Sequence, residues 1–179
     1  MYKIDKIDCK IVNLLMKDGR MPASEIARSL GNVSERAVRY RIERMIEEKI
    51  IRISAIPNPF ILGYGVVADV FIEVESSLII EVANLLAKYD FIRYVACSVG
   101  ESDISVQVVA HDADEVYAIA TGVIGKIAGV RKTTTSIVPL TIKDIHDWGI
   151  PTSICIEPPE GEHDQETTEQ IPETSPISG

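Results

Sequence analysis

One stretch decides how this chain is interpreted: residues 34–48, with the sequence SERAVRYRIERMIEE. The hydroxyl of Ser34 can accept a hydrogen bond from a free backbone amide in the first turn of a helix. The apolar residues stand at i, i+4, i+7 and i+8, the spacing of one helix face: Val38, Ile42, Met45 and Ile46. The stretch therefore predicts a capped amphipathic helix that needs a core on one side.

The opposite side of this helix is polar and rich in arginine. A turn of about 100° per residue places five residues there: Arg36, Arg39, Tyr40, Glu43 and Arg44. Arginines crowded into the first two turns of a capped helix suit entry into a DNA major groove. The plainer interpretation is a solvated face whose glutamates pair with arginines three or four residues away.

Two shorter helical patterns precede this stretch. Asp5 is a candidate N-cap of a first helix that ends at Gly19, and Pro22 precedes a second helix over residues 23–30 that ends at Gly31. Three short helices, the last two joined by a tight turn, predict a helix-turn-helix domain over residues 1–56. The β-branched residues 50–56 predict a strand that leaves this domain.

Charge is divided unevenly along the chain. The net charge is −9, but residues 1–60 carry +4, residues 61–150 carry −6 and residues 151–179 carry −7. Because phosphates attract positive charge, only the first third of the chain suits nucleic acid.

The pattern changes after residues 57–64, which contain Pro57 and Pro59 and predict a linker. Residues 65–150 show alternating apolar residues interrupted by helical patterns at 78–87 and 112–126. The order βαββαβ predicts a ferredoxin-like α+β domain with both helices on one face of an antiparallel sheet. Val67 and Phe71 lie on the second face, which indicates an oligomer interface.

The C-terminal residues 151–179 are acidic and rich in Pro, Glu and Thr, and about 157–179 are expected to be disordered. The tail could repel DNA, recruit a partner or aid solubility. Neither a signal peptide nor a membrane-length apolar run is present, so we expect a cytoplasmic protein. The three cysteines, Cys9, Cys97 and Cys155, lie far apart and are expected to be reduced.

The motifs together resemble those of the Lrp/AsnC family of archaeal and bacterial transcription regulators. The resemblance rests on residues 34–42 (SxxAVxxRI), 47–51 (EEKII), 99–103 (VGxxD) and 129–135 (GVxxTxT), which follow one another in the family's order. It implies a sequence-specific regulator that binds a pseudo-palindromic operator in double-stranded DNA. It also implies assembly of the chain into dimers, tetramers or octamers through the second domain.

The resemblance and the helix pattern together define two sets of site residues. For DNA we expect seven contacts, of which Arg41 and Arg44 lie nearer to phosphates: Ser34, Glu35, Arg36, Arg39, Tyr40, Arg41 and Arg44. The family pattern implies an amino acid or related metabolite as effector, lined by Gly100, Glu101, Ser102, Asp103, Thr133 and Thr135. The plainer interpretation of residues 100–103 is a hairpin turn only.

Other functions are weaker interpretations of this sequence. His111, Asp112 and Asp114 suggest a metal site, but a strand end and a capped helix explain them better, so we expect no metal and no cofactor. No catalytic motif appears, so we expect no enzyme and no catalytic residue. The alternatives are a siroheme-decarboxylase-like enzyme on the same scaffold and a non-specific architectural DNA-binding protein.

Overall fold

The computed structural model describes residues 2–156 of the chain, which fall into two compact units. One unit is formed by residues 2–54 together with residues 147–156, and the other is Ala55–His146. The segment 57–64, predicted to be a linker, is thus grouped with the second unit. None of the helices between residues 2 and 156 has both the length and the apolar character needed to span a bilayer.

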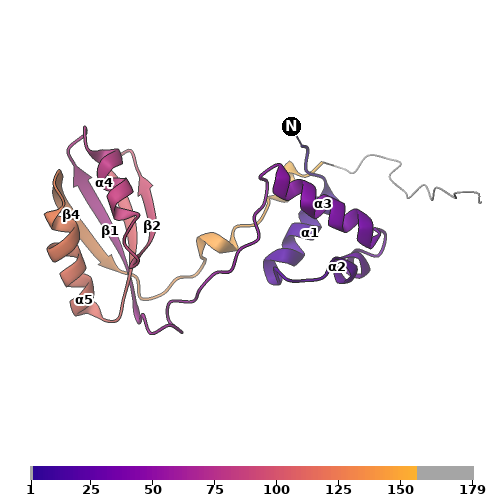
Figure 1. The fold of residues 1–179 in the computed structure, drawn as a ribbon, viewed down its shortest axis with the longest axis horizontal. Coiled ribbons are helices and arrows are strands. Elements are labelled where there is room, and N and C mark those ends of the chain that lie inside the picture. The colour runs from indigo at the N-terminus through magenta and orange to yellow at the C-terminus, as the bar shows by residue number, and fades with distance from the viewer. Residues whose placement is uncertain (1, 157–179) are drawn as a thin grey trace, which may run out of the picture. The chain divides into compact units, whose positions relative to one another are not determined.

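The first unit contains three helices, α1 (Lys6–Lys17), α2 (Ala23–Leu30) and α3 (Glu35–Glu47) (Figure 1). Asp5 caps α1 as expected, and its Oδ1 accepts hydrogen bonds of 2.8 Å from the amides of Ile7 and Asp8. Gly31 ends α2 with a φ of +79°, a conformation that glycine adopts without a Cβ clash. Ser34 Oγ accepts a 3.2 Å hydrogen bond from the amide of Ala37, which confirms the predicted cap of α3.

The core of the first unit lies between the three helices. Its buried side chains are Ile11, Val12, Ile26, Val38 and Met45. Ile46, which we expected on the inner face of α3, is 42% exposed. The buried face of α3 therefore covers a narrower part of the helix surface than the spacing of its apolar residues predicts.

The C-terminal segment, predicted to be part of the tail from residue 151, packs on the first unit as far as Ile156. Ile150 contacts the core, and Ile156 forms a parallel bridge with Asp5. Cys9 and Cys155 form a disulfide, so the prediction of reduced thiols is wrong for this pair. Folding brings the two sulfurs together from positions 146 residues apart. Residues 157–179, predicted to be disordered, lie outside the described residues.

Residues 50–56 do not form the strand that their β-branched residues predict. The backbone there is irregular, and Ile53 and Ile56 are 49% and 58% exposed. A strand needs a neighbouring strand for its ladder of hydrogen bonds, and no described strand pairs with this segment. Local β propensity alone therefore did not decide the conformation.

The second unit has the predicted βαββαβ order. Its strands are β1 (Val66–Val74), β2 (Ile92–Cys97), β3 (Ile104–Ala110) and β4 (Val130–Ile137), which form an antiparallel sheet in the order β2-β3-β1-β4. Helix α4 (Ile79–Leu86) joins β1 to β2. Helix α5 (Ala113–Ala118), continued by a π-helical turn and a 3₁₀ turn as far as Lys126, joins β3 to β4.

Both helices pack on one face of the sheet (Figure 1). Val70, paired with Val106 and Thr135, lies in the core between the sheet and the side chains of Leu86 and Ile124. This arrangement confirms the predicted α+β fold class. On the opposite face, Phe71 is 41% exposed, whereas Val67 is buried.

Candidate nucleic-acid interface and effector turn

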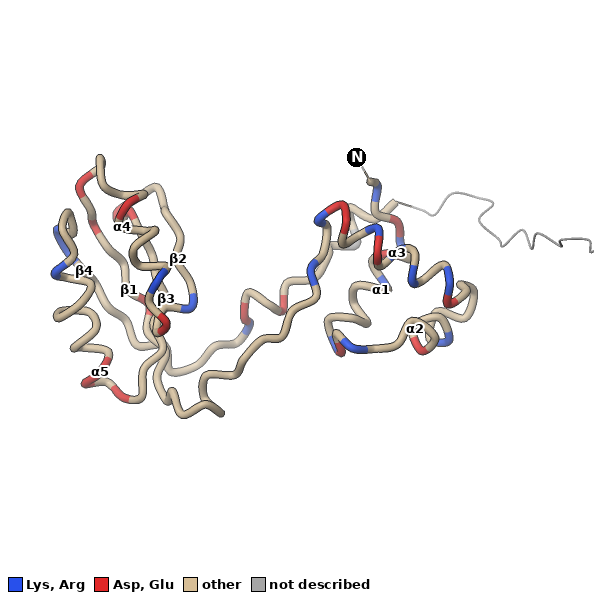
Figure 2. The backbone as a smooth tube through the Cα atoms, in the orientation of Figure 1, with Lys and Arg blue, Asp and Glu red and all other residues tan. Residues whose placement is uncertain are grey.

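Helix α3 presents a charged, exposed face. Ser34 at the cap of this helix is half-buried. Five of the other predicted DNA-contact residues are exposed: Glu35, Arg36, Arg39, Tyr40 and Arg44. Figure 2 shows Lys and Arg in blue along α3, interspersed with Asp and Glu in red. Arginines and glutamates are therefore mixed along the helix, and one such pair, Arg39 with Glu35, is in contact.

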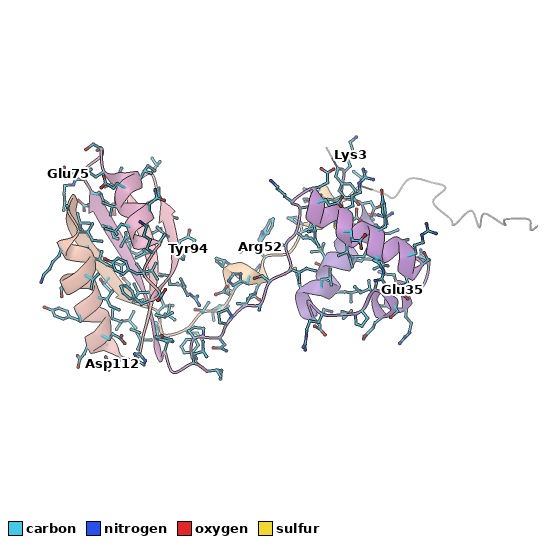
Figure 3. All side chains as sticks on the ribbon, viewed as in Figure 1. Lys3, Glu35, Arg52, Glu75, Tyr94 and Asp112 are labelled. Atoms are coloured by element: carbon cyan, nitrogen blue, oxygen red, sulfur yellow. A yellow bond between two sulfur atoms is a disulfide. The ribbon has the colours of Figure 1, made fainter. Side chains whose placement is uncertain are left out.

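Arg36 and Arg39 differ in whether another side chain already contacts their guanidinium groups. Arg39 forms an ion pair of 2.6 Å with Glu35, one turn earlier and labelled at the start of α3 in Figure 3. Both side chains are largely exposed, so water screens the pair and a phosphate or a base edge can replace Glu35 at small cost. Arg36 has no hydrogen bond or ion pair to any residue between 2 and 156, which leaves its guanidinium free to bind a partner.

Arg44 is held in place by two tyrosines. Its Nη1 donates a 2.8 Å hydrogen bond to Tyr40 Oη, and this bond raises the pKa of Arg44. Its guanidinium carbon lies 5.0 Å from the ring centre of Tyr2 and 5.9 Å from that of Tyr40. Contact with the ring faces orients the cation without neutralising it, which suits a phosphate contact.

Arg41 corrects the sequence interpretation, because it does not lie on the exposed face. It is buried, and its Nη1 donates to Asp5 Oδ2 at 2.7 Å and to Asp8 Oδ1 at 2.9 Å. Burial lowers the pKa of Arg41, but the hydrogen bonds to Asp8 and Asp5 outweigh that effect and raise it. With its charge engaged inside the unit, Arg41 joins α3 to the start of α1 and is not a candidate for phosphate contact.

Tyr2 completes this buried cluster. Its hydroxyl donates a 2.8 Å hydrogen bond to Asp8 Oδ2, and its ring lies against Arg44. Burial, together with the hydrogen bond to Asp8, raises the pKa of Tyr2. This cluster was not predicted from the sequence, although position 41 falls between Val38 and Met45 on the inner face of the helix.

The predicted effector residues lie in two places of the second unit, the turn between β2 and β3 and the edge strand β4. Gly100 has a φ of +152°, and Glu101 beside it is exposed. Asp103 Oδ2 accepts a 2.7 Å hydrogen bond from the amide of Val74 and lies 3.6 Å from Arg131 Nη2. The carboxylate therefore fastens the turn to β1, in agreement with the plainer interpretation, and one of its oxygens is already engaged.

Thr133 and Thr135 lie on β4, opposite Ile72 and Val70 of β1. The carbonyl of Ile72 accepts a 2.9 Å hydrogen bond from the amide of Asp103, so the turn and Thr133 flank the same residue of β1 from opposite sides. Thr133 is half-buried and Thr135 is exposed, while Ser98 Oγ donates to the carbonyl of Ser102 at 2.8 Å. Thr135 lies opposite Val70, which is two residues further along β1 from the turn than Ile72.

His111 and its acidic neighbours form a helix cap, as the plainer interpretation predicts. Asp112, labelled at the start of α5 in Figure 3, accepts a 2.8 Å hydrogen bond from the amide of Glu115. Glu115 Oε2 contacts both the amide and Nδ1 of His111 at 2.6 Å, and these bonds lower the pKa of Glu115. Within residues 2–156, His, Cys, Asp and Glu side chains do not gather into a group that could hold a metal ion.

Comparison with known proteins covers both units. Residues 4–46 match the AsnC-type helix-turn-helix domain, and residues 67–146 match the Lrp/AsnC ligand binding domain. An uncharacterized HTH-type transcriptional regulator of Pyrococcus abyssi is 38% identical over 148 residues, which is 82% of this chain and 90% of the relative.

Two solved structures share the architecture. AsnC of E. coli superposes with a TM-score of 0.73 at 26% identity, over 81% of this chain and 99% of AsnC. A transcriptional regulator of Neisseria meningitidis, solved in complex with L-Met, has a TM-score of 0.73 at 20% identity, over 79% of this chain and 94% of its own.

Proposed function

Since this chain belongs to the Lrp/AsnC family of DNA-binding transcriptional regulators, we propose that α3 reads the bases of a specific operator. Arg36 and Arg39 are the base-reading side chains in this proposal, because a guanidinium can bond guanine O6 and N7 together. Arg44 contacts phosphate, while Ser34, Glu35 and Tyr40 lie at the edge of the groove. The observation that carries the proposal is the exposed face of α3, on which Arg36 is unpaired among residues 2–156.

Regulators of this family bind DNA and form oligomers, and we propose a symmetric dimer as the smallest DNA-binding form. A twofold dimer presents two α3 helices, so its operator is pseudo-palindromic with half-sites one helical turn or a multiple apart. The open sheet face around Phe71 supports this proposal, because an exposed aromatic side chain there gains from burial against a second copy. Tetramers or octamers would join such dimers through a second kind of contact, because a twofold contact is complete with two copies, and would bend the DNA.

For the second unit we propose an amino acid or a related metabolite as effector. The turn at residues 100–103 offers backbone amides to a carboxylate, the free oxygen of Asp103 suits an ammonium, and Thr133 supplies a hydroxyl nearby. The complex of the Neisseria regulator with L-Met motivates this class of ligand. An effector regulates only if it binds the two assembly states with different affinity.

We propose that the chain is a regulator and not an enzyme, and that it works in the cytoplasm, where the genome lies. A transcription regulator needs recognition of DNA and not a chemical reaction, and the α3 face offers groups for recognition. No bond is broken or formed in this function.

The test is a binding titration of the full chain on its own upstream DNA, followed by fluorescence anisotropy and compared with random DNA. Replacing Arg36 or Arg39 with Ala should weaken operator binding by about 5- to 100-fold and reduce discrimination between the two DNAs, because one base contact contributes about 1–3 kcal/mol. Lys88→Ala, an equal change of charge on an exposed residue of the second unit, is the matched control. Equal affinity of the wild-type chain for both DNAs would refute specific reading.

A further inference from the structure

The last described residues of the chain are fastened to the first unit. Cys155 is bonded to Cys9 of α1, and Ile156 forms two backbone hydrogen bonds, a 3.0 Å bond from the amide of Lys6 and a 3.1 Å bond to the carbonyl of Ile4. These three contacts fix the point from which residues 157–179 depart. The tail therefore begins on the first unit, whose described residues 2–54 and 147–156 carry 12 Lys and Arg against 9 Asp and Glu, a net charge of +3.

That point lies beside helix α3. Asp5, the bridge partner of Ile156, forms an ion pair with Arg41 of α3. Tyr2, three residues before Asp5, carries the guanidinium of Arg44 on its ring. The fixed start of the tail is therefore linked through two successive contacts to the proposed DNA-binding face.

The charge of the tail is opposite to that of the first unit, although the exposed face of α3 itself carries Glu35, Glu43 and Glu47 beside its three exposed arginines. Residues 157–179 contain no Lys or Arg and seven acidic residues: Glu157, Glu160, Glu162, Asp164, Glu166, Glu169 and Glu173. The second unit offers no comparable attraction, because residues 55–146 carry 6 Lys and Arg against 11 Asp and Glu, a net charge of −5. A random coil of the same length as residues 157–179 spans about 26 Å end to end, and α3 is about 20 Å long, so a chain of this length is long enough to reach the whole helix.

We propose that residues 157–179 dock on the exposed arginines of α3 and compete with operator DNA for them. Carboxylates of the tail take the places of phosphates on Arg36, Arg39 and Arg44. The Cys9–Cys155 disulfide holds the start of the tail at α3 and so keeps its effective concentration there high, in the millimolar range typical of a short flexible tether. This inference rests on the proposed assignment of the α3 face to DNA.

Competition of this kind is weak and sensitive to salt. Exposed ion pairs are screened within about 10 Å at 0.1 M salt, so the tail is displaced once DNA makes several phosphate contacts. Its effect is to raise the threshold for binding and to penalise non-specific DNA most, because non-specific binding depends almost entirely on the same charges. The tail would therefore sharpen selectivity at the cost of affinity.

The first experiment compares three proteins on operator DNA by anisotropy at 50 and 300 mM salt. They are the full chain, a chain that stops after Ile156, and a full-length chain in which the six tail glutamates are changed to Gln and Asp164→Asn is added. We expect both altered chains to bind about tenfold more tightly than the wild type at 50 mM salt and less than twofold more tightly at 300 mM. Equal affinity of all three chains would overturn the proposal.

A second experiment locates the docking face. A fluorescein-labelled peptide of residues 157–179 is titrated with the chain that stops after Ile156. We expect saturable binding that Arg39→Ala and Arg44→Ala weaken at least threefold and Lys88→Ala leaves unchanged. Binding that is indifferent to both arginines would place the tail elsewhere and overturn the proposal.

A third experiment tests the anchor. A dithiol reductant transfers two electrons and two protons to the Cys9–Cys155 bond, which gives two thiols and leaves the reductant as a disulfide. Reduction should tighten DNA binding by the full chain at 50 mM salt and leave the chain without residues 157–179 unaffected. Cys97→Ser, which removes the exposed thiol outside the disulfide, is the matched control and should respond as the wild type does. No response of the full chain would refute anchoring by the disulfide.

The outcomes separate this inference from the proposed function. If no form of the chain prefers operator over random DNA, the proposed function fails. If all forms bind operator equally well, only the docking of the tail fails.

Discussion

Replacing Arg41 with Met tests whether this residue is a buried structural cation or a phosphate contact. The side chain of Arg41 is 11% exposed, and those of Asp5 and Asp8 are 6% and 1% exposed. Methionine fills most of the volume but leaves two carboxylates side by side without a cation. Removing one partner of a buried ion pair typically costs about 3–5 kcal/mol, most of it from the charge that is left unpaired.

The measurement is urea unfolding followed by the fluorescence of Trp148. This is the single tryptophan of the chain and it belongs to the first unit, so its emission reports on that unit. We expect Arg41→Met to lower the free energy of unfolding of the first unit by about 3 kcal/mol. Adding Asp8→Asn to this variant should restore part of the loss, because it removes one of the two stranded charges.

The same variant separates structure from DNA contact. Under conditions where Arg41→Met is folded, the slope of log affinity against log salt should equal that of the wild type. Arg44→Ala should reduce this slope by about one, as expected for the loss of a phosphate contact. A loss of stability below about 1 kcal/mol together with a reduced salt slope for Arg41→Met would refute the buried role.

Three further predictions concern Tyr2, Cys155 and Asp103. Because the pKa of Tyr2 is raised in the folded state, the contribution of Tyr2 to stability is fully present below about pH 10 and is lost as the pH rises through the folded-state pKa. The free energy of unfolding of the first unit, measured by Trp148 fluorescence, should therefore decline less steeply above about pH 10 in Tyr2→Phe than in the wild type. Cys155→Ser should lower the stability of the first unit by about 2–5 kcal/mol, measured by the same fluorescence, and an unchanged midpoint in urea would contradict it. Asp103→Ala leaves the amide of Val74 without its hydrogen-bond acceptor and should destabilise the second unit by about 1–3 kcal/mol, measured by circular dichroism during unfolding. It should also weaken the binding of a candidate amino acid, measured by calorimetry. Unchanged stability would show that the hydrogen bond contributes nothing.

Local signals predicted most of the fold. The cap at Ser34, the glycine at Gly31 and the alternation in β1 depend on neighbours in sequence, and the structure contains all three. Packing of α4 and α5 on one sheet face then follows from which side of each element is apolar. These features are encoded within windows of a few residues.

Long-range contacts were the part that sequence reasoning missed. Cys9 and Cys155 are separated by 146 residues, and spacing gives no sign that they meet. Arg41 was assigned to phosphate by its charge, although its position on the inner face of α3 indicated burial and Asp5 and Asp8 stand ready on α1. Residues 50–56 have strand-forming side chains but lack a described strand to pair with.

The site residues were predicted less completely than the fold. Helical periodicity could place Arg36, Arg39 and Arg44 outside, but it could not show that Glu35 holds Arg39 or that Tyr2 holds Arg44. Both contacts depend on side-chain rotamers and, for Tyr2, on the path of the chain before α1. Those details decide which arginine is free for DNA.

The joining of both chain ends in the first unit imposes an order on its maturation. Cys9 leaves the ribosome early, and its partner is made 146 residues later, a delay of roughly 7–30 s at typical rates of synthesis. During that interval the three helices must hold together without the bridge, with Cys9 as a thiol. A translation product that stops before Cys155 therefore carries all three helices but lacks the disulfide, so the bridge can form only after residue 155 has been made.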